Sequence, residues 1–182
     1  MLHHKGTQKI KTERLILRRY NLSDAYNMYK NYAADKRVTQ FLNWEPYSCV
    51  EDIETFVNDV ITSYEKPDTY HWAIIYEGEI IGAISAWAIN EQDCNCEVGY
   101  NIGYDYWNKG IMTEALTAVI RYLFDEVKMH RILAKHDVDN PASGKVMQKC
   151  GMKREGIFRQ YYLHEDGTYS DSVLYSILEN ER

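Results

Sequence analysis

A ten-residue segment, 106–115 (YWNKGIMTEA), combines the features of an anion-binding turn. It follows a predicted strand and opens a predicted helix, and the first backbone amides of a helix have no partner inside it. Those amides and the helix dipole attract an anion, and Gly110 has no Cβ to hold the anion away. Lys109 adds a positive charge. We therefore expect a diphosphate here, held mostly by the backbone of Lys109, Gly110, Ile111, Met112 and Thr113.

Two common diphosphate motifs do not match this segment. A P-loop requires GxxxxGK[ST], whereas Lys109 here precedes Gly110. A dinucleotide-binding fold requires GxGxxG after a first parallel strand, and Gly99 and Gly103 do not provide it. Taken alone, the segment fits a plain strand-to-helix turn equally well, so its meaning depends on the elements around it.

Seven segments have strand patterns, and two pairs of them form predicted hairpins around Glu77-Gly78 and Asp166-Gly167. The predicted strands are 13–20, 70–76, 79–89, 94–102, 131–138, 154–164 and 169–178. Four segments have helical spacing of apolar residues, at 22–32, 48–64, 111–127 and 140–150. Ser23 and Ser48 are the expected N-caps of the first two helices, and Asn140-Pro141 begins the last.

The order of these elements indicates the fold class. Antiparallel hairpins alternate with strand–helix–strand crossovers, which predicts an α+β fold with helices on both faces of one mixed, mostly antiparallel, seven-stranded sheet. The 182 residues fit a single domain, 1–182, and a hydrophobic content of 45% is sufficient for its core.

Composition also limits the partners. The net charge of −6 argues against nucleic acid and favours a cationic acceptor such as an amine. No apolar run approaches the roughly 18 residues of a membrane helix, and the start of the chain does not resemble a signal peptide, so we expect a cytoplasmic protein. Cys94-Asn95-Cys96 is not a CxxC motif, and no zinc pattern accompanies it, so we expect no metal.

Segment 106–115 resembles the acetyl-CoA loop (Q/R-x-x-G-x-G/A) of the GNAT N-acetyltransferase superfamily, most closely its RimJ/RimL-like branch. Trp107 takes the first, often aromatic, position, and Met112 replaces the usual small residue. Three other segments match the family in order and spacing: 12–18 (TERLILR), 97–102 (EVGYNI), and 137–143 followed by 149–152. The resemblance covers roughly residues 12–178. It implies a GNAT-like sheet whose fourth and fifth strands, 94–102 and 131–138, splay apart.

The resemblance implies acetyl-CoA as donor, a primary amine as acceptor, and direct attack in a ternary complex. Asn140 would cap its helix and meet the pantetheine arm, along which Tyr100, Asn101 and Ile102 would lie. The branch acetylates protein N-terminal amines, such as those of ribosomal proteins, and its relatives modify small amines. A homodimer is an expectation from the family alone.

Two residues are candidates for catalysis. Glu97 lies on the face of its strand opposite the apolar stripe and could deprotonate the acceptor ammonium, directly or through water. A solvent-facing carboxylate is the alternative. Ser143 would act near the thioester as a donor to the departing thiolate or the oxyanion, because Met147 stands where many family members have a tyrosine. A simple role in the first turn of the helix is the alternative for Ser143.

The acceptor is expected between the first two helices and the last hairpin. Its candidate walls are aromatic and could hold a cation, although each ring could instead belong to the core: Phe41, Trp44, Tyr47, Tyr161 and Tyr162. The acceptor itself stays open between a protein N-terminus, a polyamine and an aminoglycoside-like drug. A non-catalytic acyl-CoA sensor and a nucleotide-binding regulatory domain are the alternatives from other functional classes.

Overall fold

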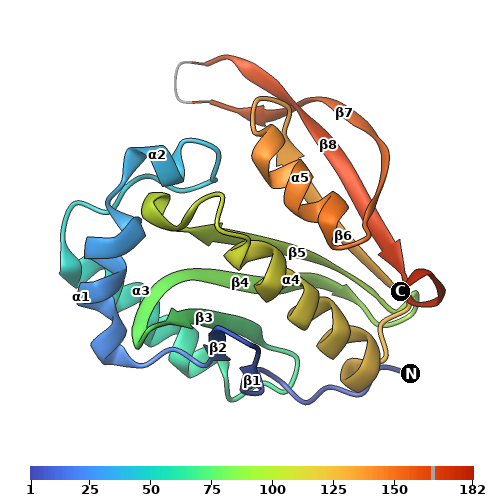
Figure 1. Ribbon diagram of the computed structural model, residues 1–182, viewed down its shortest axis with the longest axis horizontal. Coiled ribbons are helices and arrows are strands. Elements are labelled where there is room, and N and C mark those ends of the chain that lie inside the picture. The colour runs from blue at the N-terminus through green and yellow to red at the C-terminus, as the bar shows by residue number, and fades with distance from the viewer. Residues whose placement is uncertain (165–166) are drawn as a thin grey trace.

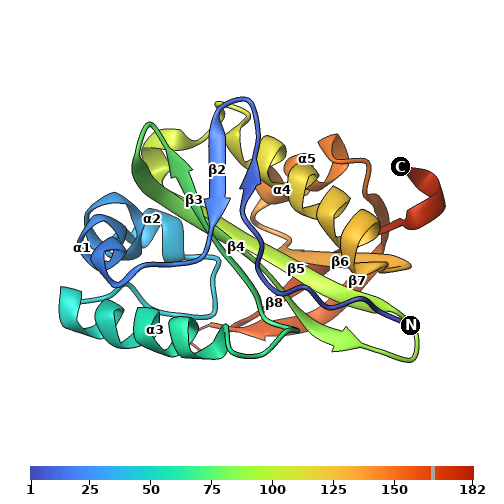
Figure 2. The ribbon, with the colours of Figure 1, turned by 90° about the horizontal axis from the view of Figure 1, so that it is seen from below.

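The computed structural model describes residues 1–164 and 167–182, in which all strands join one eight-stranded sheet (Figures 1 and 2). The spatial order is β1-β2-β3-β4-β5-β6-β8-β7, and every neighbouring pair is antiparallel except β5–β6. The bounds are β1 Ile10–Lys11, β2 Leu15–Arg18, β3 Tyr70–Tyr76, β4 Glu79–Asn90, β5 Asn95–Ile102, β6 Arg131–Asp137, β7 Lys153–Leu163 and β8 Tyr169–Leu178. The mixed, mostly antiparallel α+β fold is confirmed, and the count of seven strands is one short, because β1 is too short to carry a sequence pattern.

Helices cover both faces of the sheet, as Figure 2 shows. On one face lie α4 (Ile111–Tyr122), extended by a π-helical turn (Leu123–Val127), and α5 (Pro141–Lys149). The other face carries a short helical series and one long helix: the 3-10 turn Leu22–Asp24, α1 (Ala25–Met28), the π-helical turn Tyr29–Ala33, α2 (Lys36–Thr39) and α3 (Val50–Ser63). Two further 3-10 turns are Tyr104–Tyr106 and Glu179–Glu181.

The sheet separates two hydrophobic cores. In β3, Trp72 and Ile74 face the larger core under α4, whereas Ala73 and Ile75 face the smaller core under α1 and α3. Alternate residues of a strand point to opposite faces, so a strand covered on both sides is apolar throughout, as YHWAIIY nearly is. Each large apolar side chain buried in this way contributes about 1.5–3 kcal/mol.

Two predicted N-caps were wrong by one or two residues. The first helical series is capped by Asn21 rather than Ser23, and the Asp24 carboxylate accepts the Asn21 backbone amide at 2.8 Å. In α3 the extended loop runs one residue further than predicted, so Cys49 takes the N-cap position and the box 48–51 does not form. The Cys49 thiol instead contacts Asp52 at 3.3 Å.

The two strands of the parallel pair separate early. β5 and β6 are paired over three residues each, ending at Glu97 and Leu133, after which β5 follows β4 and β6 follows β8. The predicted splay between these strands is therefore present. The turn of the last hairpin was assigned to Asp166-Gly167, and Asp166 lies outside the described residues. No helix in 1–164 or 167–182 has the length and apolar character needed to cross a membrane.

Candidate active site

A cavity of about 350 Å³ opens beside the splay. Its walls come from α2 and the loop after it, the end of β5, the loop before α4, the first turn of α4, and α5 along its length. The lining residues that matter below are Phe41, Tyr100, Asn101, Ile102, Gly110, Ile111, Met112, Thr113, Asn140, Ser143, Lys145 and Lys149. The cavity thus gathers nine of the ten residues predicted to bind the cosubstrate. Lys109 is not part of its wall.

At the N-terminus of α4, the first backbone amides have no partner within the helix and lie at the cavity. Gly110 is the N-cap residue and has φ of 72°, in the left-handed region that glycine enters at little cost. Arg14, in the turn between β1 and β2, fixes the turn at Gly110, since its Nη1 donates to the Lys109 carbonyl at 3.0 Å and its Nε to Glu114 at 2.7 Å. Burial opposes ionisation of Glu114, but hydrogen bonds from Thr12 and Arg14 outweigh it and lower the pKa of this carboxyl.

The loop before α4 is held in place by aromatic contacts. The Trp107 indole donates to the Ile102 carbonyl at 2.9 Å and lies 5.0 Å from the Tyr104 ring, measured between centroids. Arg37 stacks over Tyr104, with its guanidinium carbon 3.8 Å from the ring centre. These contacts tie the loop to both β5 and α2, so the α4 amides are fixed in direction before any ligand arrives.

The N-terminus of α5 opens on the same cavity. Asn140 caps it, because its side-chain oxygen accepts the Ser143 amide at 3.3 Å, and Pro141 takes the first helical position. Tyr100 reaches across from β5, and its hydroxyl lies 3.0 Å from both the Ser143 hydroxyl and the Ser143 carbonyl oxygen. Asn101 Oδ1 is buried in the cavity wall with no hydrogen-bond partner among the described residues.

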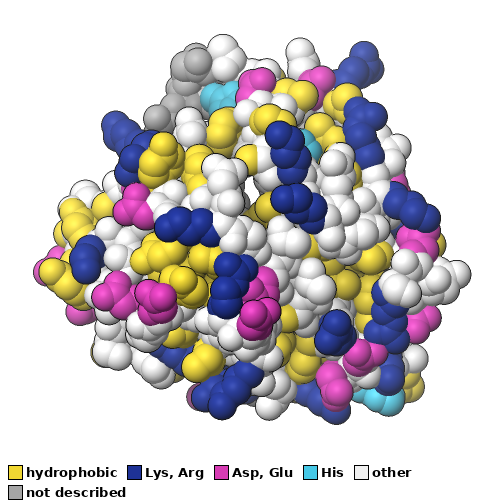
Figure 3. Space-filling model, viewed as in Figure 1, with side chains coloured by type: hydrophobic (Ala, Val, Ile, Leu, Met, Phe, Trp, Pro, Cys, Tyr) yellow, Lys and Arg dark blue, Asp and Glu magenta, His cyan; other side chains and the backbone are white. Residues whose placement is uncertain are grey.

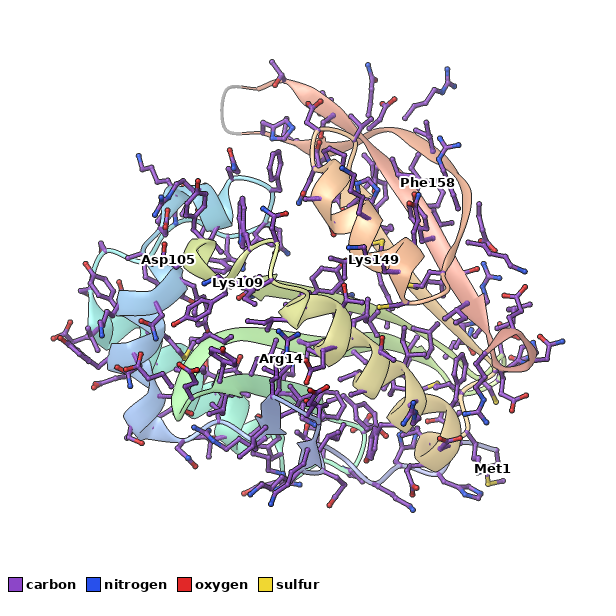
Figure 4. The ribbon with its side chains drawn as sticks, in the orientation of Figure 1. Met1, Arg14, Asp105, Lys109, Lys149 and Phe158 are labelled. Atoms are coloured by element: carbon purple, nitrogen blue, oxygen red, sulfur yellow. The ribbon has the colours of Figure 1, made fainter. Side chains whose placement is uncertain are left out.

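Basic side chains surround the mouth of the cavity in a chain whose net charge is −6. In Figure 4, Arg14, Lys109 and Lys149 lie around the N-terminal end of α4, and Figure 3 shows basic side chains over the same region. Lys145 and Lys149 line the cavity one turn apart on α5. Sequence reasoning placed neither lysine at the cosubstrate site, although Lys149 belongs to the segment 149–152 that matches the family. The spacing of four residues between the two lysines, which puts them on one face of the helix after Asn140, was a usable signal.

Glu97 lies at the last paired position of β5, before the splay, and not in the cavity wall. Its carboxylate forms an ion pair of 2.9 Å with Lys135 on β6, with 19% and 14% of the two side chains exposed. Burial lowers the pKa of Lys135, but hydrogen bonds to the Tyr161 hydroxyl and to Glu97 raise it above its usual range overall. Trp87, which sequence reasoning did not single out, is paired with Glu97 across β4 and β5.

The five aromatic residues predicted to form the acceptor site are not all together. Phe41 lines the cavity, whereas Trp44 and Tyr47 pack against the smaller core, 5.6 Å apart between ring centroids. Tyr161 and Tyr162 meet edge to face on β7. The Tyr161 hydroxyl lies 2.6 Å from Lys135 Nζ, which links this group to Glu97 rather than to the cavity.

The side chains at the site fit acetyl-CoA. Two helix N-termini and nearby lysines suit a diphosphate and a polar thioester, and Asn101 Oδ1 offers an acceptor to an amide of the pantetheine arm. Burial raises the pKa of the Cys150 thiol, at the C-terminal end of α5, which makes it a poor nucleophile. In residues 1–164 and 167–182, no three or more His, Cys, Asp and Glu side chains form a group that could hold a metal ion.

Comparison with known proteins identifies the family of the chain. Residues 14–153 match the family model "Acetyltransferase (GNAT) domain". An Escherichia coli relative, [ribosomal protein uS5]-alanine N-acetyltransferase, is 31% identical over 91% of this chain and 88% of its own. The chain therefore belongs to the GNAT acetyltransferase family and is an acetyl-CoA-dependent acetyltransferase, as the resemblance in the sequence implied.

Solved structures agree with this assignment. A GNAT acetyltransferase from Bacillus anthracis superposes with a TM-score of 0.83 at 31% identity, covering 96% of this chain and 100% of the other. The microcin C7 self-immunity acetyltransferase MccE, solved with acetyl-CoA and AMP, has a TM-score of 0.82 at 22% identity over 92% and 93% of the two chains. At that identity MccE supports the fold alone.

Proposed function

We propose that the protein, as one domain over residues 1–182, acetylates the N-terminal amine of a protein, with acetyl-CoA as donor. The E. coli relative named for ribosomal protein uS5 aligns with nearly the whole chain, which favours a ribosomal protein as the acceptor. The amine attacks the thioester directly in a ternary complex. The buried Cys150 thiol, whose pKa is raised, supports a route without a covalent enzyme intermediate.

One observation carries this proposal: the N-termini of α4 and α5 open on the same cavity. At α4, the amides of 111–113 bind the diphosphate, with Lys145 and Lys149 as nearby cations. At α5, the positive end of the helix dipole lies beside Ser143, where the thioester carbonyl and sulfur gain negative charge during transfer. Residues 100–102 connect the two ends and follow the pantetheine arm.

Each step of the transfer has a candidate group. The acceptor ammonium loses one proton to Glu97, directly or through water, and the neutral nitrogen then attacks the carbonyl carbon. The nitrogen loses its second proton to water as the amide forms. Collapse of the resulting oxyanion breaks the C–S bond and leaves the electron pair on sulfur. Ser143 stabilises that thiolate by a hydrogen bond. Because Glu97 is paired with Lys135, an approaching ammonium replaces Lys135 as the partner of the carboxylate.

An acceptor screen tests the proposal. The purified protein is incubated with acetyl-CoA and, separately, with peptides that begin with Ala or Ser, a polyamine, and an aminoglycoside, and released CoA is measured as free thiol. We expect turnover with at least one N-terminal peptide and little with the other amines. Turnover confined to the polyamine or the aminoglycoside would contradict the acceptor class, and tight acetyl-CoA binding without any CoA release would indicate a sensor.

A further inference from the structure

Tyr100 is a cavity residue with a contact that binding of the pantetheine arm does not explain. Its ring packs on the larger core, and its hydroxyl reaches from β5 to the first turn of α5, on the other side of the splay. There it lies 3.0 Å from Ser143 Oγ and 3.0 Å from the Ser143 carbonyl oxygen. The residue proposed to meet the departing sulfur is thus in direct contact with a partly buried phenol.

The number of hydrogens limits how this contact works. A phenol has one hydrogen to donate, and a carbonyl oxygen can only accept. When Tyr100 donates to the Ser143 carbonyl, its oxygen can accept from the Ser143 hydroxyl, and the serine hydrogen then points at Tyr100. When Tyr100 donates instead to Ser143 Oγ, the serine hydroxyl keeps its hydrogen free to donate to a different acceptor. Burial raises the pKa of Tyr100 well above its usual range, so the phenol keeps its proton in both arrangements.

We propose that Tyr100 is a positioning residue for acetyl transfer: by donating to Ser143 Oγ, it turns the serine hydrogen toward the departing sulfur of CoA. The inference rests on the proposed function. Met147, one turn further along α5, is 1% exposed in the larger core and has no hydroxyl to offer. Ser143 on α5 and Tyr100 on β5 therefore together provide the hydrogen-bond donor to sulfur that a tyrosine at position 147 would otherwise provide.

The step balances without a net proton transfer from either hydroxyl. The C–N bond forms, the C–S bond breaks, and its electron pair goes to sulfur, while the two protons of the acceptor ammonium that are lost go to Glu97 and to water. Ser143 donates a hydrogen bond to the thiolate, and Tyr100 donates one to Ser143, which makes the serine a stronger donor. The thiolate takes up a proton from water after CoA leaves the site.

A double-mutant cycle tests this role, using the best acceptor from the screen. Tyr100→Phe and Ser143→Ala are each expected to lower kcat about five- to tenfold, the effect of one hydrogen bond, with the KM for acetyl-CoA within about twofold of wild type. The double variant is expected to be no slower than Ser143→Ala, because Tyr100 acts only through that serine. Ser143→Thr, which keeps a hydroxyl, should retain most of the turnover and its dependence on Tyr100.

Tyr122→Phe is the matched control. Tyr122 also donates a hydrogen bond from a buried hydroxyl to a backbone carbonyl, that of Gly6 at 2.6 Å, but outside the cavity. It should lower thermal stability as Tyr100→Phe does and leave kcat unchanged. A wild-type kcat for Tyr100→Phe, or effects that multiply in the double variant, would overturn the role of Tyr100. A wild-type protein that transfers no acetyl group would instead overturn the proposed function.

Discussion

At the scale of single residues, Glu97 has a strand position that the sequence predicts and an ion-pair partner that the sequence does not reveal. Alternation along β5 was enough to place its side chain on the face opposite the larger core. Lys135 is 38 positions away, and Tyr161 lies further along the chain, so their meeting at Glu97 depends on strand order, which a single sequence does not contain. Ser143 was expected from the family resemblance, through its spacing to Asn140, whereas its contact with Tyr100 was not, because that contact crosses the splay.

We expect Glu97→Gln to lower kcat by at least about 10²-fold, the usual contribution of a general base, and to change the pH dependence of turnover. Acetyl-CoA affinity, measured by calorimetry, should stay close to wild type, because Glu97 lies outside the cavity wall. Glu155→Gln is the matched control, since Glu155 forms a comparable ion pair with Arg131 between strands. Equal turnover in Glu97→Gln and wild type would remove Glu97 from the role of base.

At the scale of elements, the strands, the two site helices and the helical segment at 22–32 followed from local patterns, whereas α2 and the mixed 3-10, α and π character of 22–33 did not. β3 and β8 have their predicted bounds, and the start of α5 followed from Asn140-Pro141. Between residues 22 and 39 the chain passes through 3-10, α and π turns of at most five residues. Such short turns depend on packing against the smaller core rather than on periodicity, which explains why α2, and with it part of the cavity wall, was missed.

The α4 N-terminus provides the test at this scale. Gly110→Asp places a side chain on a left-handed residue, at a cost of roughly 1–2 kcal/mol, and adds a negative charge beside the diphosphate amides. We expect acetyl-CoA affinity to fall at least about tenfold, which is about 1.4 kcal/mol. Gly78→Asp is the control, because Gly78 has φ of 87° in the β3–β4 turn, away from the cavity. Equal loss of affinity in both variants would show that strain alone explains the effect.

At the scale of the whole molecule, buried titratable groups make stability depend on pH. His71 lies in β3 opposite Ser85 of β4, its Nδ1 is 3.0 Å from the Ser85 hydroxyl, and burial holds its pKa below the usual range. The unfolded chain therefore binds a proton at higher pH than the folded chain. The stability from neutral His71 is complete above about pH 6.5 and is lost as the pH falls toward the lowered pKa.

Urea unfolding at pH 7, 6 and 5 measures this effect. We expect the free energy of unfolding to fall on acidification, with at most about 1.4 kcal/mol per pH unit coming from one histidine. In His71→Asn, whose side-chain oxygen can still accept from Ser85, the decrease between pH 7 and 5 should be smaller. The same pH dependence in both proteins would show that other groups are responsible.

The link between Arg14 and the turn before α4 has a consequence for how the protein is made. Arg14 and Glu114 are 100 positions apart, and α5, which also lines the cavity, begins only at Pro141. During synthesis from the N-terminus, a growing chain cannot assemble the donor site until α5 has emerged from the ribosome. We therefore expect acetyl-CoA to stabilise a ribosome-bound chain that includes α5 more than a chain that stops before Asn140.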